Sequence, residues 1–488
     1  MTIKAPSNCD MIAPDARGLE FLQSSLNTEN EFQDNNAFYE WFNSKTHNNQ
    51  FLVEEIPFDL LDNWYFEHET RNLRHSSGKF FSIEGINVNT NFGVKNKWEQ
   101  PIIIQPEIGI LGIITKVFNG VRYFLMQAKM EPGNVNIIQL SPTVQATKSN
   151  YTKVHNGKKP EYLEYFTTSS RSRIMIDQLQ TEQGARFLKK RNRNMIVEVF
   201  GEIRLLPDFV WLTLGQIKLS LKSDNNVNMD SRSVLATIPF INTDIISGFT
   251  KSKNYYFYHE SLKTDIARDI FASAADAENS LLSSDEIIGW IAEMKTKYEL
   301  SVKRIPLGNV VGWRFTDFSI NHESGDYFSV IAVKVQAGNR EVFQWTQPLI
   351  KESNLGLIGF ITKKINGMMH FLIQAKVEPG SFDVIDLAPT VSCSSYLQVL
   401  MRNERPPFLH FFDNPASERI ILSTVQSEEG GRFFHFQNKN MIIQVGEDEI
   451  TDVPDNYKWL TLAQLVKLIR FGLLNVESRS LISALSLI

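Results

Sequence analysis

Cysteine is nearly missing from this chain, whose 488 residues include two, Cys9 and Cys393. Two cysteines cannot build a disulfide framework or a thiolate metal cage. Excess charge of one sign is also missing, since the net charge is −5, and this gives no electrostatic reason to expect nucleic acid. The chain has no apolar run of membrane-spanning length, and its start, MTIKAPSNCDMIAP, holds no apolar signal region. We therefore expect a cytoplasmic protein that binds neither nucleic acid nor membrane.

The motifs of self-contained cofactor enzymes are missing as well. The sequence has no G-x-G-x-x-G after a strand, no G-x-x-x-x-G-K-[ST], no H-E-x-x-H and no G-x-S-x-G. We therefore expect neither a bound cofactor nor a metal. What is present is an ordinary globular composition, 42% hydrophobic and 22% charged, in a chain long enough for about two to four domains.

The most informative feature present is a long internal repeat. FLMQAKMEPG begins at Phe124, and FLIQAKVEPG begins 247 residues later at Phe371. Further blocks recur at nearly the same offset: RIMIDQLQTEQGARF and RIILSTVQSEEGGRF, NMIVEV and NMIIQV, and WLTL twice. A repeat of this length is a duplicated domain, not the unit of a solenoid.

Each copy predicts a mixture of strands and helices. Residues 109–118 and 121–130 read as two strands around Asn119-Gly120, the strongest short hairpin signal, and Asn366-Gly367 repeats it. WLTLGQIKLSLK predicts a helix capped by Thr213. Strands that pair as hairpins, with helices between and after them, favour an α+β fold. Residues 237–285 have no obvious repeat partner, so we predict domains at 1–236 and 286–488 joined by a helical linker.

Polar residues that recur in both copies are candidates for a site. Gln127, Lys129 and Glu131 alternate along one face of the second strand, next to a turn. A solvated Lys–Glu ladder is the plainer interpretation of this face. Both copies keep the three residues, however, and a free surface would not require this.

The segment after that strand differs between the copies. Its frame L-x-P-T-V recurs, but the polar residues of the first copy do not: Gln139, Ser141, Gln145, Thr147, Tyr151 and His155 face Asp386, Ala388, Ser392, Ser394, Gln398 and Arg402. Any one of these residues is more often a surface residue than a functional one. As a set, they predict that the first copy carries the working site.

QAKMEPGNVNIIQLSPTVQATKSNYTKVH and the following PEYLEYF, QTEQGARF, NMIVEV, WLTL and NMDSRSVL resemble the nucleotide-diphosphohexose 2,3-dehydratases. The likeness extends from about Phe38 onward and includes the duplication itself. It implies two tandem Nudix-like domains in a homodimer. It also implies loss of water from a dTDP-4-keto-6-deoxyhexose, giving a 3,4-diketo-2,6-dideoxy sugar that a downstream NADPH-dependent 3-ketoreductase would consume. The first domain would then be catalytic, and the second structural or ligand-binding.

The resemblance supplies residue types for this elimination. Glu131 or His155 would remove the hydrogen from C3, Lys129 would steady the enolate oxygen, and Tyr151 would protonate the departing hydroxyl. Arg186 and Arg232 are candidates for the diphosphate, although each recurs in the second copy and is equally explained by structure. Tyr162 or Trp98 would stack on the base, with core packing the plainer interpretation for Trp98. Further residues would hold the sugar: Gln127, Gln139, Ser141, Thr143, Gln145, Thr147 and Glu164.

Two other functions remain open from the sequence. A Nudix-type diphosphate hydrolase needs a helix bearing R-E-x-x-E-E carboxylates for Mg²⁺. The chain offers only SEEGG around Glu428 and Glu429, with Gln183 opposite Glu429 in the first copy, so hydrolysis is disfavoured. A non-catalytic nucleotide-sugar-binding protein would suit the second copy better than the whole chain.

Overall fold

The computed structural model describes residues 19–48, 51–147, 160–168, 170–241, 249–276, 279–337, 343–352, 354–393 and 405–488. Within these residues no helix is long and apolar enough to cross a membrane.

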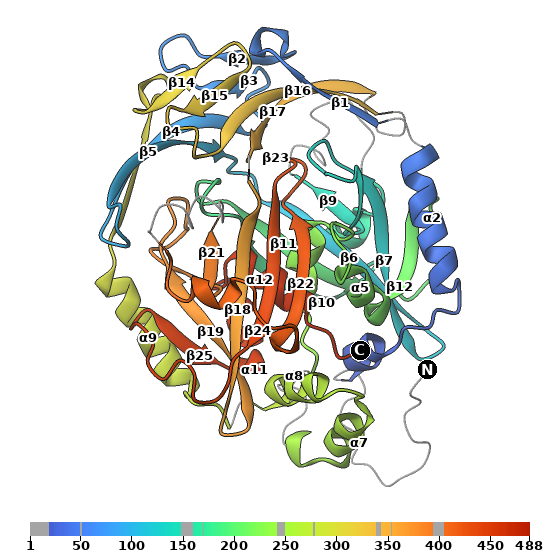
Figure 1. Ribbon diagram of the computed structural model, residues 1–488. Helices are drawn as coiled ribbons and strands as arrows, with labels where there is room; N and C mark the ends of the chain where they lie inside the picture. Colours follow the sequence, from blue (N-terminus) through green and yellow to red (C-terminus); the bar gives the residue numbers. More distant parts are fainter. Residues whose placement is uncertain are drawn as a thin grey trace.

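Two large mixed sheets, one from each copy, form the body of the protein (Figure 1). The first has the order β10 (Arg173–Thr181), β11 (Arg191–Glu198), β6 (Gly109–Phe118), β7 (Val121–Met130), β12 (Phe209–Thr213), with β8 (Ile138–Ser141) and β9 (Val144–Ala146) on β7 and β6. The second consists of β22 (Ile420–Ser427), β24 (Gln437–Gln444), β18 (Gly356–Ile365), β19 (Met368–Lys376), β20 (Asp386–Ala388), β21 (Val391–Cys393) and β25 (Tyr457–Leu460). The expectation of an α+β fold with a repeated unit is therefore confirmed.

The predicted hairpins form as expected. β6 and β7 pair antiparallel around Asn119 (φ 47°) and Gly120 (φ 82°), and β18 and β19 pair around Asn366 (φ 54°) and Gly367 (φ 77°). Positive φ at both central residues matches the right-handed twist of the strands, which is why Asn-Gly is favoured there.

Ten helices cover and separate the sheets in the described part of the chain. Their bounds are α1 (Glu20–Leu26), α2 (Asn35–Asn48), α4 (Glu164–Thr167), α5 (Leu214–Leu221), α6 (Met229–Leu235), α7 (Lys253–Ser261), α8 (Asp265–Ala275), α9 (Ser284–Lys297), α11 (Leu462–Ile469) and α12 (Val476–Ala484). Thr213 caps α5, as predicted, by accepting a hydrogen bond from the amide of Gln216. Helices α6 and α12 pack against each other, and apolar residues of both copies form one continuous core.

Helix α8 has a counterpart that the sequence comparison missed. The Ser24 hydroxyl on α1 donates to the carbonyl of Arg122 and accepts from the amide of Leu214. Ser273 on α8 makes the same two bonds to Met369 and Leu462 in the second copy. Helix α8, which lies in the segment predicted as a helical linker, is therefore equivalent to α1. The two helices keep the same contacts although their sequences have diverged. The domain boundaries themselves stay a prediction.

Two smaller sheets exchange strands between the copies. One contains β14 (Trp313–Phe315), β15 (Ser319–His322), β16 (Ser329–Ala337), β17 (Gln344–Lys351) and β23 (Phe433–Phe434), and the other contains β2 (Trp64–Phe66), β3 (Leu73–His75), β4 (Ser82–Thr90) and β5 (Lys97–Ile104). Strand β1 (Phe51–Ile56) pairs antiparallel with β16 of the second copy, and β13 (Leu300–Ile305) pairs with β4 of the first. The exchange is visible at the top of Figure 1, where blue β1 lies beside β16.

The repeated Glu-Pro-Gly turns also join the copies. The amide of Gly133 donates to the Gly430 carbonyl (2.8 Å), and the Gly133 carbonyl accepts from His435 (2.9 Å). Gly380 makes the equivalent bonds to Gly184 (2.7 Å) and Lys189 (2.8 Å). Each turn therefore docks onto a loop of the other copy: Gly133 onto the loop after β22, and Gly380 onto the loop after β10. The Glu-Pro-Gly end of the ten-residue repeat therefore recurs in both copies because each turn joins one copy to the other.

Candidate functional site

A cavity of about 860 Å³ lies at the junction of the two copies. One wall comes from the first copy: the end of β7, strand β9 and the first turn of α6. The opposite wall comes from the second copy and includes Trp345 on β17 and the loop residues Glu429 and Arg432. The cavity is therefore a composite of both repeats, made possible by the interlocked turns and exchanged strands.

Lys129, Glu131 and Gln145 form a hydrogen-bonded group on the wall from the first copy. The Lys129 Nζ donates to Oε1 of Gln145 at 2.6 Å and lies 3.3 Å from Oε1 of Glu131. The Gln145 amide donates to the same Glu131 oxygen at 2.9 Å. A carboxylate and an ammonium are thus held side by side facing the cavity, while Met126, Ala128 and Met130 contribute to the core. A base next to a cation suits proton removal beside a carbonyl group.

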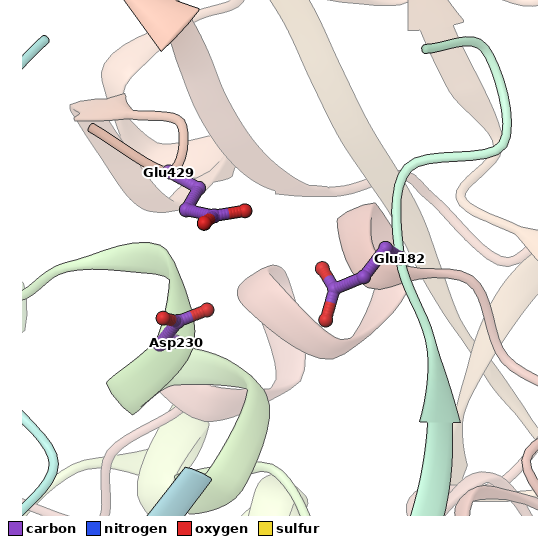
Figure 2. A group of neighbouring side chains, drawn as sticks. All are labelled: Glu182, Asp230 and Glu429. Carbon is purple, nitrogen blue, oxygen red and sulfur yellow. The ribbon is translucent and has the colours of Figure 1, made fainter. Parts of the chain in front are cut away.

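Three further carboxylates are directed toward one another (Figure 2). Glu182 follows β10, Asp230 lies in the first turn of α6, and Glu429 comes from the second copy; their oxygens lie within 4.8 Å of one another. Burial, together with the charges of Glu429 and Glu182, raises the pKa of Asp230 well above its ordinary value. Burial raises the pKa of Glu429 to about 7, against the opposing charge of Arg432.

Positive charge and amide donors surround the three carboxylates. The Asn192 amide donates to Glu182 at 2.6 Å, and Lys190 Nζ donates to Oδ1 of Asn192 at 2.8 Å. Arg432 lies over the ring of Phe81, with its Cζ 4.2 Å from the ring centre, and donates from Nε to Gln105 at 3.1 Å. Lys190 and Arg432 therefore supply positive charge beside the carboxylates.

The structure brings together only part of the predicted set. The cavity is lined by Gln127, Lys129, Glu131, Thr143, Gln145 and Thr147. Among the described lining residues the other candidates are not found: Gln139, Ser141, Tyr162, Glu164, Arg186 and Arg232. Tyr151 and His155 lie outside the described residues.

Two of the candidates away from the cavity instead hold the copies together. The buried Arg232 guanidinium donates to the Val227 carbonyl (2.9 Å) and, across the junction, to Gln426 (3.0 Å) and the Ser427 carbonyl (2.6 Å). The amide of Gln139 likewise donates to the Ser427 hydroxyl at 2.6 Å. Arg479, the counterpart of Arg232, reaches the Thr181 carbonyl in the same manner. Arg232 therefore has a structural account that does not involve phosphate.

The remaining four candidates also have protein partners, and the partner of Arg186 comes from the second copy. Arg186 pairs with Glu352, and Tyr162 donates to the Arg204 carbonyl at 2.6 Å. Glu164 lies 3.6 Å from Arg171, and Ser141 accepts from the amide of Asn228 at 2.8 Å. The Asn228 amide also lies 3.5 Å from Oε1 of Gln145, so Ser141 is linked to the group around Lys129 through Asn228.

Sequence reasoning did not select Asp230, Glu429, Arg432 and Trp345, which the structure brings to the cavity. The signal that was available is an asymmetry: Gln183 stands opposite Glu429, and Phe436 opposite Lys190, in segments that otherwise repeat. That asymmetry alone would not assign the second-copy residues to the site of the first copy, because the sequence does not show that the two copies exchange strands.

The equivalent group in the second copy has a different composition. Lys376 lies 2.9 Å from Glu378, but Ser392 replaces Gln145, and Glu477 on α12 replaces Asp230. Burial, then the charge of Glu378, raises the pKa of Glu477 to about 8.

Glu477 supplies a test of pH-dependent stability. With its pKa raised from 4.5 to about 8, this carboxyl binds a proton in the folded protein that it loses on unfolding between those values. Its contribution is therefore complete below about pH 4.5 and is lost as the pH rises through 8, by about 1.4 kcal/mol per pH unit. Glu477→Gln should flatten the fall of the urea midpoint between pH 6 and 8.5. Glu429, whose pKa is raised to about 7, titrates in both proteins and cancels in the difference. An unchanged or steeper pH dependence in the variant would contradict the assignment.

Comparison with known proteins identifies the class to which this fold and cavity belong. The sequence profile of the NDP-hexose 2,3-dehydratase family matches residues 35–238 and again residues 284–485. The chain therefore belongs to the NDP-hexose 2,3-dehydratase family, and the two matched regions are its two copies.

Curated relatives cover nearly the whole chain. A dTDP-4-dehydro-6-deoxy-α-D-glucopyranose 2,3-dehydratase of Saccharopolyspora spinosa is 44% identical over 467 residues, 95% of this chain and 94% of the relative. Proteins with the same name from Amycolatopsis orientalis and Streptomyces violaceoruber are 43% and 39% identical over 454 residues each. They span 91% and 92% of this chain, and 89% and 96% of their own lengths.

Proposed function

We propose that the protein removes water across C2 and C3 of dTDP-4-keto-6-deoxyglucose, giving a 3,4-diketo-2,6-dideoxy sugar. The observation that carries this proposal is the name shared by three relatives that match along nearly the whole chain. The cavity supports it, because an ammonium and a carboxylate stand side by side at its wall, as this elimination requires. The C4 ketone acidifies the hydrogen on C3, so no redox step is needed to start the reaction.

The Lys129 group has the parts for the first half of the elimination. Glu131 is the proposed base at C3, with His155 as the alternative, and Lys129 stabilises the oxygen of the C4 enolate. Gln127, Thr143, Gln145 and Thr147 line the same cavity and would hold the sugar hydroxyls and the ketone. The Thr143 hydroxyl also accepts from the amide of Ile114 at 2.9 Å and donates to the Leu125 carbonyl, so the position of this hydroxyl is fixed.

The wall from the second copy has parts that suit the nucleotide end. Arg432, the counterpart of Arg186, takes over the diphosphate role in this proposal, because the interlocked loops place Arg432 and not Arg186 beside the cavity. Guanidinium groups match phosphate oxygens with paired hydrogen bonds. Trp345 on the same wall offers an aromatic face to the base and is less buried than Trp64.

Trp345→Ala should raise KM for the dTDP-sugar roughly 5- to 150-fold with kcat little changed, since base–aromatic stacking contributes about 1–3 kcal/mol. Trp98→Ala is the matched control, because Trp98 bonds to Gln100 at 2.8 Å as Trp345 bonds to Gln347 at 2.8 Å. Steady-state kinetics of both variants decide the point. Equal KM for the two variants would contradict base stacking on Trp345.

We also propose the finer features that the family resemblance implies. Each large sheet, with one parallel pair of strands (β6 with β11, β18 with β24) among antiparallel ones, would be Nudix-like. The chain would form a homodimer, and a NADPH-dependent 3-ketoreductase would consume the reactive diketone product.

The first alternative function is a diphosphate hydrolase. The Nudix reaction needs its carboxylates on a helix. Here Glu428 and Glu429 lie in the loop between β22 and β23, which disfavours hydrolysis. A binding protein without catalysis is the second alternative.

Incubation with dTDP-4-keto-6-deoxyglucose, followed by mass spectrometry with reductive trapping of the diketone, tests the proposal. The expected result is loss of one water with the diphosphate intact, both in EDTA and with added Mg²⁺. Release of dTMP and a sugar phosphate would establish the hydrolase instead. An unchanged sugar that raises the melting temperature would indicate binding alone.

A further inference from the structure

Asp230 is a buried carboxyl group that lacks the partners its neighbours have. Its side chain is 2% exposed, and its Oδ2 has no hydrogen-bond partner among the described residues. Figure 2 shows its carboxyl group directed toward those of Glu182 and Glu429. An unpartnered buried carboxylate is costly, whereas the protonated acid avoids most of that cost.

The charges around Asp230 favour its protonated form over that of its neighbours. Glu182 receives a hydrogen bond from Asn192 and lies in the field of Arg479 and Lys190. Glu429 also faces Glu182 and Glu131, but Arg432 is its largest charge interaction and Lys190 adds to it. Asp230 faces the negative charges of Glu429, Glu182 and Glu131, with Lys129 opposing them. Carboxyl groups this close together in a sheltered site cannot all be ionised, so the proton they retain resides on Asp230.

Asp230 also lies on the same cavity as the base. Lys129 lies near the end of β7 and Glu131 directly follows that strand, whereas Asp230 lies in the first turn of α6; all three line the cavity. The carbon that loses the hydroxyl, C2, is bonded directly to the carbon that loses the proton, C3. The acid that acts in the second half of the elimination must therefore be a different residue from the base and must lie close to it.

We propose that Asp230 is the acid that protonates the departing C2 hydroxyl. This inference rests on the proposed function. Glu131 takes the proton from C3, and the electron pair forms the enolate held by Lys129. The ketone at C4 then re-forms, the C2–C3 double bond forms, and the C2–O bond breaks with its electrons on oxygen. That oxygen takes the proton of Asp230 and leaves as water. Tautomerisation of the resulting enol moves a proton from the C3 hydroxyl to C2, Glu131 releases the proton that it took from C3 to solvent, and Asp230 recovers one from solvent.

Asp230→Asn tests the inference by separating the two halves of the reaction. Asparagine keeps the shape of the neutral acid but cannot give up a proton, so the fold should persist and dehydration should fall at least a hundredfold. The first half should continue, because the base and Lys129 remain. In D₂O the variant should therefore still exchange the C3 hydrogen of the substrate for deuterium. Glu477→Gln, at the equivalent turn of α12, is the matched control and should dehydrate as fast as wild type.

A substrate analogue that carries fluorine at C2 provides the second measurement. Fluoride departs as a stable anion and needs no proton, so Asp230→Asn should release it at a rate close to that of wild type. The inference would be overturned if Asp230→Asn dehydrated the substrate at the wild-type rate. It would also be overturned if Asp230→Asn folded but neither exchanged the C3 hydrogen nor released fluoride. If Tyr151→Phe exchanged the C3 hydrogen without dehydrating the substrate, and Asp230→Asn did not show this behaviour, the acid would be Tyr151 instead. A wild-type protein that neither exchanges nor dehydrates this sugar would overturn the proposed function itself.

Discussion

Lys129→Ala is expected to lower kcat/KM about a thousandfold, whereas Lys376→Ala should leave it within about threefold of wild type. Removing one positioned donor from a developing oxyanion typically costs a factor of about 10²–10³, and Lys129 would also cease to orient Glu131 (3.3 Å) and Gln145 (2.6 Å). Lys376 holds the same place in the repeat, with Glu378 at 2.9 Å and Ser392 at 3.4 Å. The pair is thus a matched comparison of one residue in two settings.

Turnover of the dTDP-sugar, measured with melting curves for both variants, decides whether the first copy alone carries the chemistry. Lys129→Arg keeps the positive charge and should recover part of the loss. Equal losses of turnover in Lys129→Ala and Lys376→Ala, with both proteins folded, would show that the two copies contribute equally.

Gly133→Ala is expected to have the largest effect on stability. A Cβ added there would lie 1.5 Å from the carbonyl oxygen of Phe433 and 2.6 Å from its carbon. Both are backbone atoms, so the turn must move, and the bonds that Gly133 makes to Gly430 and His435 break with it. We expect destabilisation of more than about 4 kcal/mol, the range of exceptional core substitutions. Activity should fall with it, because the same loop carries Glu429 and Arg432 to the cavity.

Two further glycines make this experiment specific. Gly380→Ala should be equally damaging, since its Cβ would lie 1.7 Å from the Phe187 carbonyl oxygen. Gly201→Ala has nothing within 4 Å of the added carbon and should change stability by no more than about 0.5 kcal/mol. Urea midpoints and size-exclusion profiles of the three variants provide the measurement. A Gly133→Ala protein as stable as Gly201→Ala would show that the docked turns do not join the copies.

The sequence predicted the parts of the fold that depend on local chemistry. Asn119-Gly120 defined a hairpin because few other residue pairs adopt its backbone angles, and Thr213 defined a helix start through its side-chain oxygen. The partners of β1 and β13 could not be predicted. Each strand offers the same alternating pattern to β4 and to β16, so local preference does not distinguish pairing within a copy from pairing between copies.

The same limit explains what was missed in the site. The strand carrying Lys129 and Glu131 was identified, because polar residues alternate along it. Arg232 was proposed to bind phosphate, but its guanidinium binds backbone carbonyls. The sequence does not distinguish an arginine of this kind from one that binds a ligand. Glu429 and Arg432 were missed because they reach the cavity across the junction of the copies, which only the folded chain reveals.

The exchanged strands constrain the order in which this protein can be made. When the first repeat has left the ribosome, β4 still lacks β13, and the cavity still lacks Trp345, Glu429 and Arg432. A sheet edge without its partner is a place where chains aggregate. The nascent first half must therefore wait, with that edge open, until residues 300–305 emerge and dock, and its cavity stays incomplete until Arg432 has followed. Slow translation of the second repeat, or its truncation, would lower the yield of folded protein even though the Lys129 group lies wholly in the first.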